Sequence, residues 1–195
     1  ALLLIVGVHP SHQDDTAIQS KILDFSNASI GFHHIHFGYR QDQMLFNNLD
    51  LHIPAGQKLG ITGGSGAGKT SLIQLLLRFY DPIQGKITIN GQDYRALDLN
   101  DLRNFFSYVP QSISLFHRSI FDNIAFGKPD ASKDEIYEAA HLCLCDEFVQ
   151  SLEKGYDTII GEGGYKISGG QRQRVALARA YIKKAPIFLL DEALS

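Results

Sequence analysis

A glycine-rich segment at residues 63–70 constrains the fold of this chain more than any other feature. Its sequence, GGSGAGKT, fits the pattern G-x-x-x-x-G-K-[ST]. The apolar run 58–62 precedes it, and an apolar helical stretch at 71–77 follows it, so the segment is predicted to join a strand to a helix. Glycines let the backbone curve with its N–H groups pointing inward around an anion. The segment therefore predicts an α/β fold with a phosphate-binding loop.

Two side chains at the end of this loop define its chemistry. Lys69 can reach the β- and γ-phosphates of a nucleotide, and Thr70 offers a hydroxyl to Mg²⁺. The glycines could instead form an ordinary tight turn, but a turn does not explain Lys and Thr at this offset. The residues expected to bind the nucleotide here are Gly63, Gly64, Ser65, Gly66, Ala67, Gly68, Lys69, Thr70 and Ser71.

A second pair of polar residues follows the short apolar run 187–190, which is typical of a buried strand. The run ends in Asp191 and Glu192. The first carboxylate can hold Mg²⁺ through water, and the second can orient or deprotonate a water that attacks the γ-phosphate in line. A solvated acidic strand end is the alternative. The phosphate-binding loop in the same chain favours hydrolysis.

The segment ISGGQRQRVALARA, at residues 167–180, resembles the LSGGQ signature and following helix of ATP-binding cassette (ABC) ATPases, with Ile167 in the leucine position. A helix that begins there has a second anion-binding N-terminus. In that family, the signature of one subunit covers the γ-phosphate held by the other, which implies a head-to-tail dimer. A serine-glycine helix cap is the alternative. The resemblance implies nucleotide contacts from Ser168, Gly169, Gly170 and Gln171.

The resemblance covers the chain from about residue 30 and implies further site residues. Tyr39 resembles the aromatic residue that stacks on adenine, although a packed hairpin aromatic is the alternative. Gln111, in the sequence YVPQ, resembles the glutamine that senses Mg²⁺ and the γ-phosphate and faces the transmembrane partner. The implied catalytic residues are Glu192, Lys69 and Gln111, and the implied metal-binding residues are Thr70, Gln111 and Asp191.

Thr158 and the segment 161–164 resemble a loop specific to exporters, which importer subunits usually lack. Together with residues 119–127, they make the chain similar to the nucleotide-binding domain of a multidrug, lipid or heavy-metal half-transporter. This resemblance implies ATP and Mg²⁺ as cofactors, ATP hydrolysis that powers export, a fused transmembrane domain and a place at the cytosolic face of a membrane. The alternatives are a soluble ABC-type ATPase acting on DNA or ribosomes, and a non-hydrolysing nucleotide-binding partner.

The family pattern Asp-Glu-Ala-Thr-Ser is replaced here by DEALS at 191–195. The rest of the D-loop and the switch histidine of the family would lie beyond Ser195. We therefore expect this chain alone to bind nucleotide and to hydrolyse it poorly.

Strands that alternate with helices indicate a mixed α/β fold. The family resemblance implies that this fold is a P-loop NTPase core with an N-terminal antiparallel β subdomain and an inserted α-helical subdomain at about 112–172. The β subdomain is expected from a hairpin of residues 30–37 and 45–53 and a further strand at 86–90. The hydrophobic fraction of 44% suffices for a sizeable core.

The two ends of the chain are expected to differ. Residues 1–8 are apolar but fewer than the roughly 20 that a helix needs to cross a bilayer. The polar stretch 9–28 is typical of a linker. We interpret 1–28 as a linker or the tail of a preceding transmembrane region, with a short buried helix as the alternative, and 29–195 as the nucleotide-binding domain, its C-terminal end missing.

Charge and cysteine content add weaker constraints. The net charge of −3 gives no basic footprint, so no nucleic-acid partner is expected. Cys143 and Cys145 are too few for a secreted disulfide framework, which favours a reducing compartment. The histidines at 33, 34 and 36 lack further ligands at metal-binding spacing, so no zinc site is expected.

Overall fold

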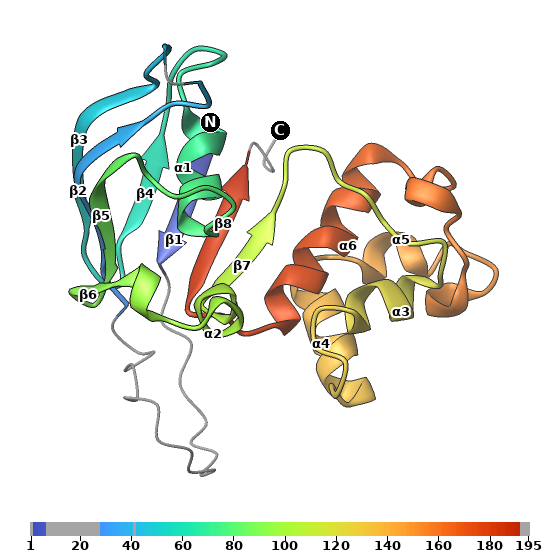
Figure 1. Cartoon of the computed structure of the whole chain (residues 1–195). Coiled ribbons are helices and arrows are strands. Elements are labelled where there is room, and N and C mark those ends of the chain that lie inside the picture. The colour runs from blue at the N-terminus through green and yellow to red at the C-terminus, as the bar shows by residue number, and fades with distance from the viewer. Residues whose placement is uncertain (1, 7–27, 41, 192–195) are drawn as a thin grey trace, which may run out of the picture. The chain divides into compact units, whose positions relative to one another are not determined.

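The structure, a computed structural model, describes residues 2–6, 28–40 and 42–191 (Figure 1). The chain divides into two compact units. The first consists of the chain up to Phe106 together with the strand that begins after Ala185, and the second is Ser107–Lys184. Part of the expected linker and the residue Glu192 lie outside the described residues.

An antiparallel sheet forms one half of the first unit, with the strand order β3-β2-β5-β6. Its strands are β2 (Ile30–Phe37), β3 (Phe46–Ile53), β5 (Gln84–Ile89) and β6 (Gln92–Asp93). The pairing of β2 with β3 confirms the expected hairpin, and Ile30 lies opposite both Ile53 and Ile89. These apolar positions are buried, so the sheet presents an apolar face to the core.

A second sheet in this unit contains β4 (Lys58–Ile61), β1 (Leu2–Val6) and β8 (Ile187–Asp191). The strand β1 lies between the other two and is antiparallel to both, with Leu4 opposite Leu59 and Leu189. This differs from the expectation that the apolar start belongs to a linker. A run of five apolar residues is long enough for a strand, and both neighbouring strands offer it backbone partners.

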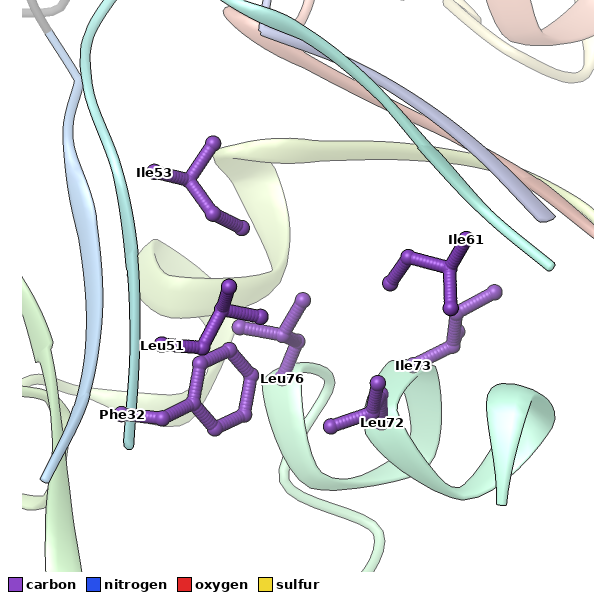
Figure 2. Close-up of a pocket in the computed structure, with 7 residues that line it drawn as sticks. All are labelled: Phe32, Leu51, Ile53, Ile61, Leu72, Ile73 and Leu76. Atoms are coloured by element: carbon purple, nitrogen blue, oxygen red, sulfur yellow. The ribbon is translucent and has the colours of Figure 1, made fainter. Parts of the chain in front are cut away.

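The helix α1 (Lys69–Leu76) follows β4 through the glycine-rich loop. Its apolar side chains meet those of β2, β3 and β4 around a small pocket (Figure 2). The pocket is lined by Phe32, Leu51, Ile53, Ile61, Leu72, Ile73 and Leu76. Apolar packing on this side fixes the position of α1, and therefore also the position of the glycine-rich loop at its N-terminus.

The remaining elements of the first unit connect these layers. The short helix η2 (Tyr94–Ala96) precedes α2 (Leu99–Asn104), and Asp98 caps α2 by accepting from the backbone N–H of Asn100 at 2.8 Å. The strand β7 (Phe106–Val109) begins at the last residue of the unit.

The second unit is helical, as expected for the inserted subdomain. It contains α3 (Ile120–Ala125), α4 (Lys133–Leu142), α5 (Asp146–Val149) and α6 (Gly169–Ile182), with the short helices η3 (Gly155–Asp157) and η4 (Glu162–Gly164). Both α3 and α4 pack on α6, whose buried residues include Val175 and Ala178. Within the described residues, no helix has the length and apolar character that a membrane crossing requires.

The two cysteines have a packing role. Cys145 is buried and Cys143 is partly buried, and neither forms a disulfide. Burial raises the pKa of the Cys143 thiol to about 11 and that of Cys145 to about 12. Both thiols are therefore held in the unreactive protonated form at neutral pH.

Candidate nucleotide-binding site

The glycine-rich loop adopts a backbone conformation that favours glycine at two positions. Gly66 has φ +79° and Gly68 has φ +89°, both in the left-handed region. A Cβ atom at Gly68 would approach the ring of Phe46 to 2.7 Å, whereas at Gly66 it would meet nothing within 4 Å. The loop is thus packed against β3 on one side and exposed on the other, where an anion can approach.

Lys69 reaches back over this loop from the first residue of α1. Its Nζ donates hydrogen bonds to the carbonyl oxygens of Gly63 at 2.9 Å and of Gly64 at 3.0 Å. These bonds hold the ammonium group above the curve of the backbone. The positive charge therefore lies at the loop, the place that the sequence pattern predicts for it.

Thr70 and Asp191 lie next to each other. The Thr70 hydroxyl donates to Oδ2 of Asp191 at 2.9 Å, and the aspartate is buried, with 2% of its surface exposed. A hydroxyl and a carboxylate oxygen are ligands that Mg²⁺ prefers, directly or through water. This donor set fits a magnesium ion, with Asp191 supplying the negative charge.

Tyr39 is held beside the first two turns of α1. Its hydroxyl lies 2.8 Å from Oγ of Ser71 and donates to Oε1 of Gln74 at 2.5 Å. The edges of its ring meet Phe37 and Tyr80 in T-shaped contacts with centroid distances of 5.1 and 5.2 Å. Since 53% of Tyr39 remains exposed, an aromatic surface borders the helix that carries Lys69 and Thr70.

In the second unit, the signature residues form the N-terminus of α6. Ser168 is the N-cap, its hydroxyl accepts from the backbone N–H of Gln171 at 3.2 Å, and Oε1 of Gln171 accepts from the backbone N–H of Ser168 at 2.8 Å. This reciprocal arrangement is a capping box. A Cβ atom at Gly170 would meet nothing within 4 Å, so the first turn of α6 is open to solvent.

Arg172 supports this turn and was not identified from the sequence. Its Nη1 donates to the carbonyl oxygen of Ile167 at 2.9 Å, which fixes the chain directly before the N-cap. Its aliphatic stem lies at Gly164, where a Cβ atom would come within 3.0 Å of Cδ. The sequence gives no signal for this role, because the bond ends on a backbone carbonyl group and the stem packs at Gly164, outside the signature.

The two segments that resemble exporter sequences contact each other. The backbone N–H of Ile120 donates to the carbonyl oxygen of Thr158 at 3.1 Å, and Ser119 forms an isolated bridge with Ile159. Gly161 has φ +78° and lies against the ring of Tyr165. A Cβ atom added at Gly161 would lie 2.2 Å from the nearest ring atom. The loop around Thr158 is therefore fixed to the start of α3.

The expected site residues fall into three groups. The phosphate-binding loop, Thr70, Asp191 and Tyr39 are together in the first unit. Gln111 and the signature belong to the second unit, where Gln111 is exposed in a bend after β7. Glu192 lies outside the described residues.

Comparison with known proteins places these features in a family. The sequence profile of the ABC transporter family matches residues 46–195. The chain is 44% identical over 169 residues to the mitochondrial iron-sulfur clusters transporter ABCB7 of Oryzias latipes, covering 87% of this chain and 23% of that protein. It is 45% identical over 172 residues to the ATP-dependent lipid A-core flippase of Legionella pneumophila strain Lens, covering 88% of this chain and 29% of that protein.

A solved structure gives the same result for the fold. The structure of a bacterial Atm1-family ABC exporter with ATP bound matches with a TM-score of 0.85 and 41% sequence identity. The match covers 91% of this chain and 31% of that one, so the chain spans less than a third of the relatives it matches. The expected α/β fold, with its antiparallel β subdomain and helical insertion, is confirmed. This chain belongs to the ABC transporter family.

Proposed function

We propose that this chain is a nucleotide-binding domain that binds and hydrolyses ATP to power the export of a substrate across a membrane. The observation that carries the proposal is the hydrogen bond between Thr70 and Asp191 beside the Lys69 loop. It joins the phosphate-binding and metal-binding segments of the sequence in one place. The relatives support transport, since they are named as an iron-sulfur clusters transporter and a lipid A-core flippase, and the matching structure, named as an exporter, supports its direction.

The first step is nucleotide binding in the first unit. Lys69 exchanges its bonds to the carbonyl oxygens of Gly63 and Gly64 for bonds to the β- and γ-phosphates. The backbone N–H groups of residues 64–70 surround the phosphates, and Tyr39 stacks on the base. The apolar packing of α1 keeps the glycine-rich loop in place during this exchange.

Hydrolysis requires groups around the γ-phosphate. Glu192 accepts a proton from the attacking water, and the family resemblance implies that Gln111 senses the γ-phosphate. Thr70 and Asp191 would hold Mg²⁺, with Gln111 as a further ligand that the resemblance implies, and the ion would neutralise charge on the phosphate oxygens. Asp191 ends β8, and Thr70 lies in the first turn of α1.

The open turn at Ser168 supports a second part of the proposal. A helix N-terminus with two glycines and free space favours an anion, and Ser168 to Gln171 meet the γ-phosphate held by a second nucleotide-binding domain. Two such domains form a head-to-tail dimer. A transmembrane domain joins each of them at Gln111 and at the loop around Thr158, on the cytosolic face of the membrane.

The test of this function is Glu192→Gln in the full-length protein. The amide keeps the shape of the side chain but cannot accept the proton from water, so ATP binding is expected to stay within about twofold while phosphate release falls at least about a hundredfold. The control is Glu153→Gln, at an exposed glutamate of the second unit. A Glu192→Gln protein that releases phosphate at the wild-type rate contradicts the assignment.

A further inference from the structure

Arg179, near the end of the signature helix α6, makes three hydrogen bonds and two ring contacts within the second unit. Its Nε donates to the carbonyl oxygen of Asn123 at 2.9 Å, and Nη2 donates to Oδ1 of the same residue at 2.6 Å. A third bond runs from Nη1 to the carbonyl oxygen of Ser114 at 3.3 Å. The planar guanidinium thus joins α6 to α3 and to the segment that precedes α3.

Asn123 continues this network. The residue is fully buried, and its Oδ1 also accepts from the backbone N–H of Phe116 at 2.9 Å. Its Nδ2 donates to the carbonyl oxygens of Phe116 at 3.0 Å and Ser119 at 2.9 Å. One amide side chain therefore fixes both ends of the turn that leads into α3, and a charged or apolar residue could not make the same bonds.

The guanidinium also lies over an exposed aromatic pair. The Cζ of Arg179 is 5.0 Å from the ring centroid of Phe116 and 6.0 Å from that of Phe126. The two rings are 4.5 Å apart, and 42% of Phe116 and 57% of Phe126 are exposed. Burial lowers the pKa of Arg179, so its charge is partly desolvated and is stabilised by carbonyl oxygens and ring faces.

The chain at Gly127, just after α3, approaches the backbone of α6 too closely to leave room for a side chain. A Cβ atom at Gly127 would come within 1.9 Å of the carbonyl oxygen of Arg179. The chain directly after α3 therefore packs against the α6 backbone at Arg179. A displacement of the backbone at Gly127 would therefore press on the backbone of α6 at Arg179.

We propose that Arg179 is a positioning residue: with Asn123 it fixes the exposed Phe116–Phe126 pair, and the segment after Gln111, to the helix that begins at the signature residue Ser168. The inference rests on the proposed function, because the position of α6 matters for transport only if this chain powers export. Arg179 itself neither contacts the nucleotide nor transfers a proton. Its consequence is that motion at the aromatic pair and motion at the signature are one rigid displacement.

The first experiment tests the contacts in the 195-residue chain by NMR and amide exchange. In the wild-type chain, Nε–H of Arg179 should exchange at least tenfold more slowly than in a free arginine and shift upfield under the Phe116 ring. Arg179→Lys keeps the charge but loses the planar fork. It should raise the exchange rate of the Phe116 amide at least tenfold.

Arg174→Lys is the matched control. Arg174 lies on the same helix and bonds to the carbonyl oxygen of Leu144 and to Glu147, away from Asn123. It should leave the Phe116 amide within twofold of wild type. The proposal is overturned if Nε–H of Arg179 is unprotected in the wild-type chain, or if the two substitutions have equal effects. The wild-type measurement decides even if Arg179→Lys does not fold.

The second experiment uses the full-length protein in vesicles. Arg179→Lys should leave the dissociation constant for ATP within twofold and reduce the substrate transported per ATP at least fivefold, whereas Arg174→Lys should change neither. An unchanged ratio in Arg179→Lys overturns the positioning role. If the wild-type protein itself neither hydrolyses ATP nor transports, the proposed function fails, and the exchange result on the isolated chain still stands as a separate finding.

Discussion

The hydroxyl of Thr70 donates a hydrogen bond to Oδ2 of Asp191 at 2.9 Å, although 121 positions separate the two residues. Thr70 belongs to the first turn of α1 and Asp191 ends β8. The strand β1 lies between β8 and the strand that leads into the glycine-rich loop. The contact between the two side chains therefore depends on the arrangement of the whole sheet.

We expect the two members of this pair to respond differently to substitution. In Asp191→Asn, an amide oxygen still accepts from Thr70, so the free energy of unfolding should fall by no more than about 1 kcal/mol. The loss of charge should abolish the gain in ATP affinity that Mg²⁺ provides. Thr70→Ala should cost about 1–3 kcal/mol of stability, because it removes a hydrogen bond from a buried carboxylate.

Urea unfolding and calorimetric ATP titration with and without Mg²⁺ measure these effects. Asp130→Asn, at an exposed position of the second unit, is the control and should change neither quantity. If Asp191→Asn retained the magnesium-dependent affinity, the metal would have to be held by other residues.

Lys69→Ala should abolish tight binding of ATP with Mg²⁺ while the chain stays folded. Within the part of the chain that the structure describes, the ammonium bonds to the carbonyl oxygens of Gly63 and Gly64, so its loss removes the charge opposite the phosphates without opening the core. We expect the dissociation constant to rise at least about a hundredfold, or about 2.8 kcal/mol.

Titration calorimetry checks this, with Lys58→Ala as the control. Lys58 is exposed on β4, and its removal should alter the affinity by less than about twofold. A folded Lys69→Ala chain with wild-type affinity would exclude the loop as the phosphate site.

Local patterns in the sequence were sufficient for most of the elements and for the position of Lys69 at the glycine-rich loop. The hairpin of β2 and β3, the helix after the glycine-rich loop and the helix after the signature all lie within a few residues of their expected bounds. Each has short-range causes, namely alternation, glycine at special backbone angles and capping. The same holds for Lys69, whose offset from the glycines is fixed by the loop.

Features that depend on contacts distant in sequence could not be predicted. The start of the chain contains no signal that separates a linker from the strand β1, because its partners β4 and β8 come much later in the chain. The supporting bonds of Arg172 and Arg179 likewise end on backbone carbonyls, and a carbonyl group is present at every residue.

Ser168→Ala should destabilise the start of α6 without unfolding the chain. It removes one half of a capping box, which we expect to cost about 0.5–2 kcal/mol in urea unfolding. Ser132→Ala is the matched control, since Ser132 caps α4 with Glu135 in the same manner. The two variants should lose similar stability, but only Ser168→Ala should impair ATP-dependent dimerisation, measured by light scattering. Equal dimerisation of the two variants would contradict a role for Ser168 across the dimer.

Gly127→Ala tests the close approach of α3 to α6 in the second unit. The added Cβ atom would lie 1.9 Å from the carbonyl oxygen of Arg179, and a backbone atom cannot move aside as a flexible side chain does. We expect a loss of about 3 kcal/mol or more in the free energy of unfolding, together with faster amide exchange at Phe116. Gly60→Ala on β4 is the control, since nothing lies within 4 Å of its added Cβ atom, and its effect should stay below about 1 kcal/mol. Urea unfolding of both variants decides, and a Gly127→Ala chain as stable as Gly60→Ala would show that α3 and α6 can separate at Arg179 without cost.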